Sequence, residues 1–193
     1  MKLYSTKIYQ KLYNETGIQK VAEILFEFPE KEFSLSDLAK EAGVAKANIG
    51  SMLKILYKAE FIEITKLNKI WRIKAKQNSW NFIKAKIVRN LHLIYQSNVV
   101  EFLNDYYRNP KAIVLFGSFR KGEDMTGSDI DIAIETDEVQ NYKILNLKEL
   151  ADFENILGRK IQIHIFNRKD VDINVFNNIA NGIVLGGFLE VRK

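Results

Sequence analysis

The spacing of apolar residues in the first part of the chain predicts a small helical unit followed by two strands. Apolar residues recur every three or four positions in three segments, which predicts three short amphipathic helices: residues 17–28, 34–42 and 45–59. Pro29 ends the first predicted helix, and Gly43 separates the second from the third. Two short apolar runs, 61–64 and 70–73, flank a polar stretch, which predicts two strands joined by a basic tip.

The middle of the chain has a long helical pattern. Residues 79–107 contain no Gly or Pro, and apolar residues recur there at helical intervals. This pattern predicts one long helix or two helices in series. Its apolar face is too rich for a free linker, so we expect it to pack on one or both neighbouring domains or to form a dimer seam.

The last part of the chain mixes strand and helix patterns. Apolar runs and alternation predict strands at 112–116, 129–134 and 160–166. Helical spacing predicts helices at 144–157 and 175–180. This order predicts a small mixed β-sheet with helices on one side, in a chain of the α+β class. The expected parts are residues 1–78, a connecting helix over 79–109 and a C-terminal domain over 110–193.

The strongest chemical signal is a pair of carboxylates that follows a Gly-Ser turn. Gly117 and Ser118 end one apolar strand, and Asp129 and Asp131 begin the next. A spacing of two puts both carboxylates on one face of a strand, where a cation offsets their repulsion and oxygen ligands suit Mg²⁺. The turn offers N–H groups and a hydroxyl to a phosphate, so the combination indicates nucleotidyl or phosphoryl transfer. The alternative is a turn with solvated acids, because Asp and Ser favour turns.

This segment resembles the signature of the DNA-polymerase-β-like nucleotidyltransferases, especially the minimal nucleotidyltransferases of prokaryotes. Their pattern is Gly-Ser, a spacer and Asp-x-Asp, with Arg-Gly-Glu after Gly-Ser; here Lys121 stands where Arg is usual. The resemblance covers about residues 110–166 and implies a small mixed sheet with helices. It also implies transfer of a nucleoside monophosphate from an NTP to a hydroxyl acceptor, with Mg²⁺ held by Asp129 and Asp131. The nucleotide-binding residues that it implies are Gly117, Ser118, Lys121 and Ser128.

The chain departs from the family pattern at one position. In the resembling family a third carboxylate comes from a neighbouring strand, and the corresponding position here is Gln162. A neutral amide cannot act as a base near neutral pH. His164 lies two positions further on the same face and could accept a proton or bind a metal, so it joins the two carboxylates as a candidate catalytic residue. Asp170 and Asp172 are further acids downstream.

The N-terminal unit resembles the winged helix-turn-helix domains of prokaryotic regulators, because helix, Gly-containing turn, helix and two strands follow one another. In that comparison residues 45–59 form the recognition helix, and the tip between the strands is the wing. Their outward side chains are candidate contacts to duplex DNA. These residues are Lys46, Asn48, Ser51, Lys54, Lys58, Lys66 and Lys69. A role in protein contacts is the open alternative.

Composition distinguishes the two ends of the chain. Residues 1–78 carry 14 Lys and Arg against 9 Asp and Glu, whereas residues 110–193 carry 11 against 13. The basic excess favours an acidic partner for the first part. The absence of Cys excludes disulfides and thiolate metal sites. The polar N-terminus and the lack of an apolar run near the ~20 residues of a membrane helix predict a cytoplasmic protein without membrane contact.

Three functions are compatible with these patterns. The first is a Mg²⁺-dependent nucleotidyltransferase, which the Gly-Ser turn and the paired carboxylates favour. The second is a regulator or antitoxin-type partner-binding protein with a degenerate transferase domain, which Gln162 favours. The third is a protein-interaction module. The expected partners are an NTP, duplex DNA and either a partner protein or a second copy of the chain.

Overall fold

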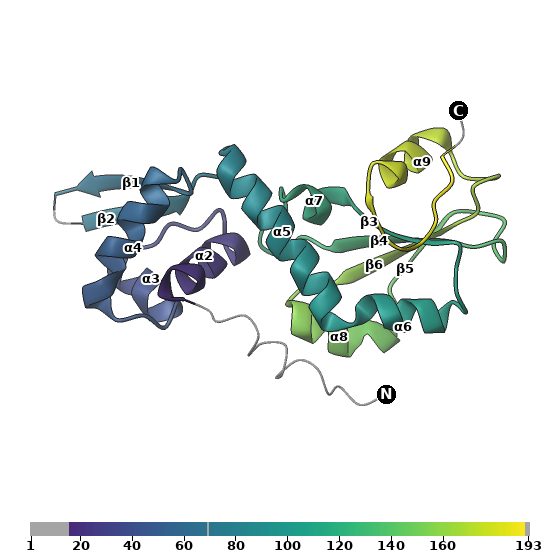
Figure 1. Cartoon of the computed structure of the whole chain (residues 1–193), viewed down its shortest axis with the longest axis horizontal. Coiled ribbons are helices and arrows are strands. Elements are labelled where there is room, and N and C mark those ends of the chain that lie inside the picture. Colours follow the sequence, from purple (N-terminus) through teal and green to yellow (C-terminus); the bar gives the residue numbers. More distant parts are fainter. Residues whose placement is uncertain (1–15, 69, 192–193) are drawn as a thin grey trace. The chain divides into compact units, whose positions relative to one another are not determined.

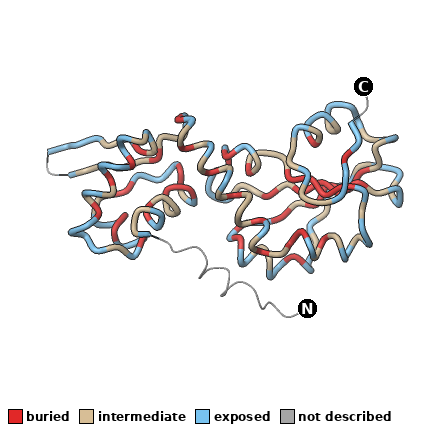
Figure 2. Tube along the Cα trace, in the orientation of Figure 1, coloured by how far each residue is buried: buried red, intermediate tan, exposed pale blue. Residues whose placement is uncertain are grey.

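The computed structural model describes residues 16–68 and 70–191. The chain divides into two compact units between Lys86 and Ile87, within one helix of the connecting segment. Each unit has its own hydrophobic core, seen as the buried stretches in Figure 2. No helix in the described residues combines the length and apolar character needed to cross a membrane.

The first unit contains the helices and strands that its apolar spacing predicts. Thr16 and Gln19 form a reciprocal capping box at the start of the first helix, and Ser34 caps the second through the Asp37 amide. The two strands pair antiparallel, and Phe33 adds an isolated bridge to Ile73. The elements are α2 (Gly17–Glu27), α3 (Leu35–Glu41), α4 (Lys46–Lys58), β1 (Ile62–Leu67) and β2 (Ile70–Ala75).

The connecting segment forms two helices in series, as one of the two predicted alternatives. The break lies at Asn98, whose φ of 60° belongs to the left-handed region and stops regular helix hydrogen bonding. The two helices are α5 (Trp80–Ser97) and α6 (Val99–Tyr106).

The second unit is built on a five-stranded mixed sheet in the order β5-β6-β4-β3-β7. Only β4 and β6 pair in parallel, and the other neighbours are antiparallel. The strands are β3 (Ala112–Phe116), β4 (Ile130–Glu135), β5 (Lys143–Leu145), β6 (Ile161–Phe166) and β7 (Ile183–Gly187). The helical elements are α7 (Gly117–Lys121), η1 (Lys148–Leu150), α8 (Ala151–Leu157) and α9 (Ile173–Ala180).

Helices cover both faces of this sheet, so the prediction of helices on one side was wrong. Ile113 and Leu115 of β3 pack in one core with α6 and α8, whereas Ala112 and Val114 pack in a second with Ile179 of α9. Figure 1 shows α9 across the sheet from α6 and α8. Because successive β3 side chains point to opposite faces and are all apolar, both faces need a cover.

The helix predicted over residues 144–157 was also wrong in its first part. Lys143–Leu145 forms the edge strand β5, and Ile144 pairs with His164 of β6. The apolar residues of this segment have helical spacing. Residues 143–145 are nevertheless extended, because the edge of β6 offers them backbone hydrogen bonds that add a strand to the sheet. The α-helix begins only at Ala151.

Candidate active site

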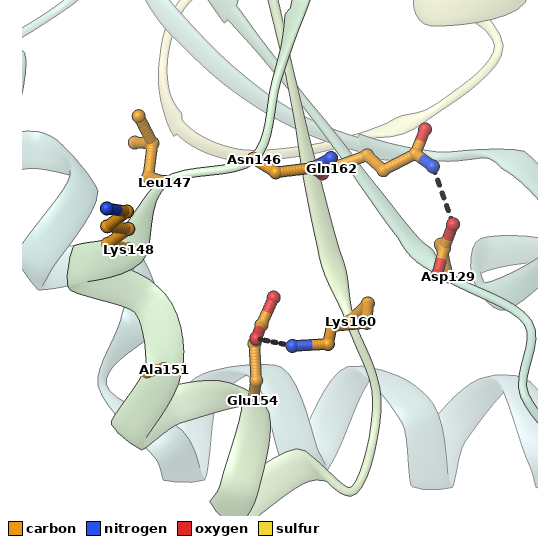
Figure 3. A pocket seen from close by; sticks show the side chains of 8 residues that line it. All are labelled: Asp129, Asn146, Leu147, Lys148, Ala151, Glu154, Lys160 and Gln162. Carbon is orange, nitrogen blue, oxygen red and sulfur yellow. Dashed lines mark hydrogen bonds and ion pairs between the residues drawn. The ribbon is translucent and has the colours of Figure 1, made fainter.

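The paired carboxylates lie where three strands meet on the α9 face of the sheet. Asp131 is the register partner of Phe116 on β3 and of Gln162 on β6. Gln162 donates from Nε2 to Asp129 Oδ2 at 2.5 Å (Figure 3). Because Gln162 is also the register partner of Asp131, both acids and the amide lie on one face. Asp129 and Asp131 therefore share one face, as predicted, and Gln162 lies beside them.

Gly117 leaves space for the side chain of Asp131. The residue has φ +72°, and a Cβ built on it would overlap the carboxylate of Asp131. The carboxylate thus rests directly against the Gly117 backbone at the start of α7. A side chain at position 117 would compete with Asp131 for the same space.

We therefore expect Gly117→Ala to cost more stability than the backbone strain alone. Gly158→Ala is a matched control, because Gly158 also has positive φ (+66°) but a Cβ placed there would meet no atom within 4 Å. The control should lose about 1–2 kcal/mol from strain, and Gly117→Ala about 1–3 kcal/mol more from the clash with Asp131. Chemical denaturation of both variants measures the difference in the free energy of unfolding. Equal losses in the two variants would show that the Asp131 carboxylate does not pack against Gly117.

His164 connects Asp131 to a residue that the sequence did not indicate. Its Nε2 lies 3.1 Å from Asp131 Oδ1, and its Nδ1 lies 2.5 Å from the Tyr142 hydroxyl. His164 is 6% exposed, and its ring stands edge-on to the Phe116 ring, with centroids 4.8 Å apart. Both ring nitrogens of His164 are thus engaged within the protein.

The Asp131 carboxylate sets the direction of these hydrogen bonds. A carboxylate only accepts, so Nε2 of His164 donates to Asp131. In a neutral His164 the proton then sits on Nε2, and Nδ1 accepts from the Tyr142 hydroxyl. Burial, and secondarily the negative charge of Asp131, raise the pKa of the Tyr142 phenol, so the hydroxyl keeps the proton that it donates.

Two cavities flank the carboxylates. One, of about 500 Å³, lies at α7 and α9, and its lining residues are Phe116, Gly117, Arg120, Lys121, Asn178 and Asn181. The other, of about 490 Å³, is shown in Figure 3 and is lined by Asp129, Asn146, Leu147, Lys148, Ala151, Glu154, Lys160 and Gln162. We name them the Gly117 cavity and the Asp129 cavity.

In the lining of the Asp129 cavity, the carboxylate of Glu154 accepts two hydrogen bonds. Glu154 accepts from Lys160 Nζ at 2.7 Å and from the Ile161 amide at 3.0 Å. Although burial opposes ionisation, these hydrogen bonds and the Lys160 charge leave the pKa of Glu154 below its usual value. Glu154 and Lys160 therefore form a charged pair in this lining. In all, two acidic residues and two lysines line the cavity.

Only one of the other predicted nucleotide-binding residues lines the Gly117 cavity. Lys121 is exposed and lines it, while Ser118 is partly buried in α7 and is not among its lining residues. Ser128 accepts from the Met125 amide at 2.9 Å, so its hydroxyl closes a turn before Asp129. Asp172 caps α9 by accepting from the Asn174 amide at 2.8 Å. In residues 16–68 and 70–191, no three His, Asp or Glu side chains gather as a metal cluster.

The predicted DNA-contacting residues lie on the outer side of the first unit. The buried face of α4 is formed by Ile49, Leu53 and Leu56. Lys66 on β1 lies with its Nζ 4.3 Å from the centroid of the Trp71 ring. Lys69 lies outside the described residues. The remaining candidates are exposed on α4: Lys46, Asn48, Ser51, Lys54 and Lys58.

Comparison with known proteins gives one family match and two similar proteins. The family model "Polymerase beta, Nucleotidyltransferase" matches residues 97–186. Two relatives from Methanocaldococcus jannaschii are each named as a candidate protein adenylyltransferase. MJ1379 is 41% identical over 64 residues, which is 33% of this chain and 63% of that protein. MJ1215 is 44% identical over 81 residues, which is 42% of this chain and 90% of that protein. The chain thus spans under two thirds of the first relative and most of the second.

Proposed function

Since the chain belongs to the polymerase beta nucleotidyltransferase family, we propose that it transfers a nucleoside monophosphate from a nucleoside triphosphate to a hydroxyl acceptor. The observation that supports this proposal is the close packing of the Asp131 carboxylate against Gly117, with Asp129 and Gln162 on the same face. This arrangement joins the two halves of the motif in one site. Because both relatives are named as candidate protein adenylyltransferases, we propose ATP as donor and a protein hydroxyl as acceptor.

The donor set of the site suits Mg²⁺. Asp129 and Asp131 offer carboxylate oxygens, and the carbonyl oxygen of Gln162 lies on the same face. When bound, the ion supplies neutralisation of the triphosphate charge. The hydrogen bond from Gln162 to Asp129 holds that carboxylate in place, and His164 does the same for Asp131.

The proposed step exchanges one phosphorus–oxygen bond for another. The acceptor oxygen forms a bond to the α-phosphorus, the bond from that phosphorus to the bridging oxygen breaks, and pyrophosphate leaves. The acceptor proton passes to water in this proposal, because the Gln162 amide cannot take it and His164 Nδ1 already accepts from Tyr142. The test is incubation of the chain with α-labelled ATP, Mg²⁺ and candidate acceptor proteins; label that never appears on any acceptor would contradict the proposal.

The second candidate function is a regulator that binds nucleotide without turnover, and the amide at Gln162 favours it. Gln162→Asp separates the two functions. A third carboxylate beside Asp129 and Asp131 should lower the metal-free Tm by repulsion and enlarge the rise in Tm on adding Mg²⁺. Gln162→Asn is the matched control, since it has the size of Asp without its charge.

Thermal unfolding of both variants, with and without Mg²⁺, measures this effect. A gain of measurable transfer in Gln162→Asp from a silent wild type would support the regulator. An unchanged response to Mg²⁺ would show that position 162 lies outside the metal site.

We also propose that the first unit is a winged helix-turn-helix domain that binds duplex DNA. The order α3, turn, α4 and hairpin supports this, as do the exposed Lys side chains of α4 and the hairpin. Lys54→Ala should weaken binding of the full chain to duplex DNA and lower the slope of log K against log[salt] by about 0.9. Lys20→Ala, which removes an exposed charge from α2, is the control. Fluorescence anisotropy over a salt series measures both slopes, and equal effects would assign α4 no special role.

A further inference from the structure

Arg120 is a partly buried arginine with one buried donor that is unpaired within the described residues. It lies on α7 between buried Phe119 and exposed Lys121, and its Nε is buried with no hydrogen-bond acceptor. Two other arginines of the same unit behave differently. Arg159 pairs with Asp124 at 3.1 Å, and Arg168 pairs with Glu135 at 3.0 Å.

The unpaired Nε of Arg120 is a donor available to a ligand. Buried polar groups are nearly always hydrogen-bonded, and an arginine carries five donors and no acceptor. A ligand with acceptor oxygens would complete the hydrogen bonding of Nε, and an anion would also balance the charge of the guanidinium. A planar guanidinium matches the paired oxygens of a carboxylate or phosphate.

The Gly117 cavity provides the space for such an anion. Arg120 and Lys121 line it from α7, while Asn178 lines it from α9 and Asn181 from the C-cap of that helix. No acidic residue is among its lining residues, so its charged groups are both cationic. The Asp129 cavity differs, since two acids and two lysines line it. A polyanion is thus favoured in the Gly117 cavity over the Asp129 cavity.

We propose that Arg120 binds the triphosphate of the donor nucleotide in the Gly117 cavity, with its Nε and terminal nitrogens donating to phosphate oxygens. The inference rests on the proposed function for the identity of the ligand. It adds Arg120 and the α9 wall to a phosphate site that the motif alone assigns to Gly117, Ser118 and Lys121. Arg120 is thereby the residue whose unmet hydrogen bonds the nucleotide completes.

Calorimetric titration of the full chain with ATP, inorganic tripolyphosphate and adenosine tests this assignment. Arg120→Ala and the length-preserving Arg120→Met should each weaken ATP and tripolyphosphate about 10- to 100-fold, the range for charged hydrogen bonds. Adenosine binding should stay unchanged, and Arg120→Lys should keep part of the affinity because it retains the charge. Lys169→Ala, which removes an exposed charge after β6, is the control and should bind all three as wild type does.

The outcomes distinguish this inference from the proposed function. Unchanged ATP affinity in both Arg120→Ala and Arg120→Met overturns the inference even if transfer is observed. An equal loss of adenosine binding also overturns it, because Arg120 would then contact the nucleoside. A wild type that binds ATP and tripolyphosphate through Arg120 but transfers nothing supports the inference and contradicts the function. A wild type that binds neither ligand overturns both.

Discussion

Asp131→Asn is expected to abolish the stabilisation that Mg²⁺ and ATP together give the wild-type chain. The carboxylate of Asp131 lies against Gly117 and 3.1 Å from His164 Nε2, and Asp131 is the register partner of Gln162. Asparagine keeps the shape but loses the charge that a hard divalent cation requires. Asp129→Asn should have the same direction of effect, and the double variant should show no metal-dependent part.

The expected size follows from mass action. Ligand at about 100 times its dissociation constant stabilises the folded chain by about 2.7 kcal/mol. For a unit of this size that corresponds to a rise in Tm of about 10 °C. Asp152→Asn, on the exposed start of α8, is the control and should keep the full rise. If the double variant kept the rise as well, the paired carboxylates would not hold the metal.

The shared face of the two carboxylates was predictable because strand alternation alone determines it. Asp129 and Asp131 are separated by one apolar residue at the start of a buried strand, and the Gly-Ser turn ends its neighbour. The position of Gln162 was expected from the family resemblance, and the parallel register of β6 with β4 makes it the partner of Asp131. Alternation was sufficient for the two carboxylates, whereas Gln162 needed the resemblance as well.

The contact between Tyr142 and His164 could not be predicted, because it depends on strand β5, which the sequence pattern did not indicate. Ile144 pairs with His164 only because residues 143–145 form an edge strand, and Tyr142 lies two positions before Ile144 on the same side. Helical spacing of the apolar residues after Lys143 concealed that strand. Arg120 was not predicted as a site residue for a different reason. A single Arg in a short helix is expected to be exposed to solvent, and only the structure shows that its Nε is buried.

The hydrogen-bonded series Tyr142–His164–Asp131 leads to a second large expected effect. If His164 positions Asp131, His164→Ala should weaken Mn²⁺ binding and lower nucleotide transfer together, by about 10- to 100-fold. If His164 instead acts as the proton acceptor, transfer should fall by about 10²-fold while Mn²⁺ binding stays constant. Electron paramagnetic resonance of bound Mn²⁺, measured beside transfer to an acceptor, separates these two roles.

Tyr142→Phe completes the test, because it removes one hydroxyl and leaves the ring. The Phe variant should show a smaller loss of Mn²⁺ affinity than His164→Ala, since His164 keeps its contact with Asp131 but loses the donor that fixes its tautomer. Tyr142 acts only through His164 in this arrangement, so adding Tyr142→Phe to His164→Ala should cost nothing further. Tyr95→Phe, at a tyrosine 45% exposed on α5, is the control for loss of a hydroxyl. Additive losses in the double variant would show that Tyr142 acts on the site independently of His164, and a silent Tyr142→Phe would show that the tautomer needs no support from its hydroxyl.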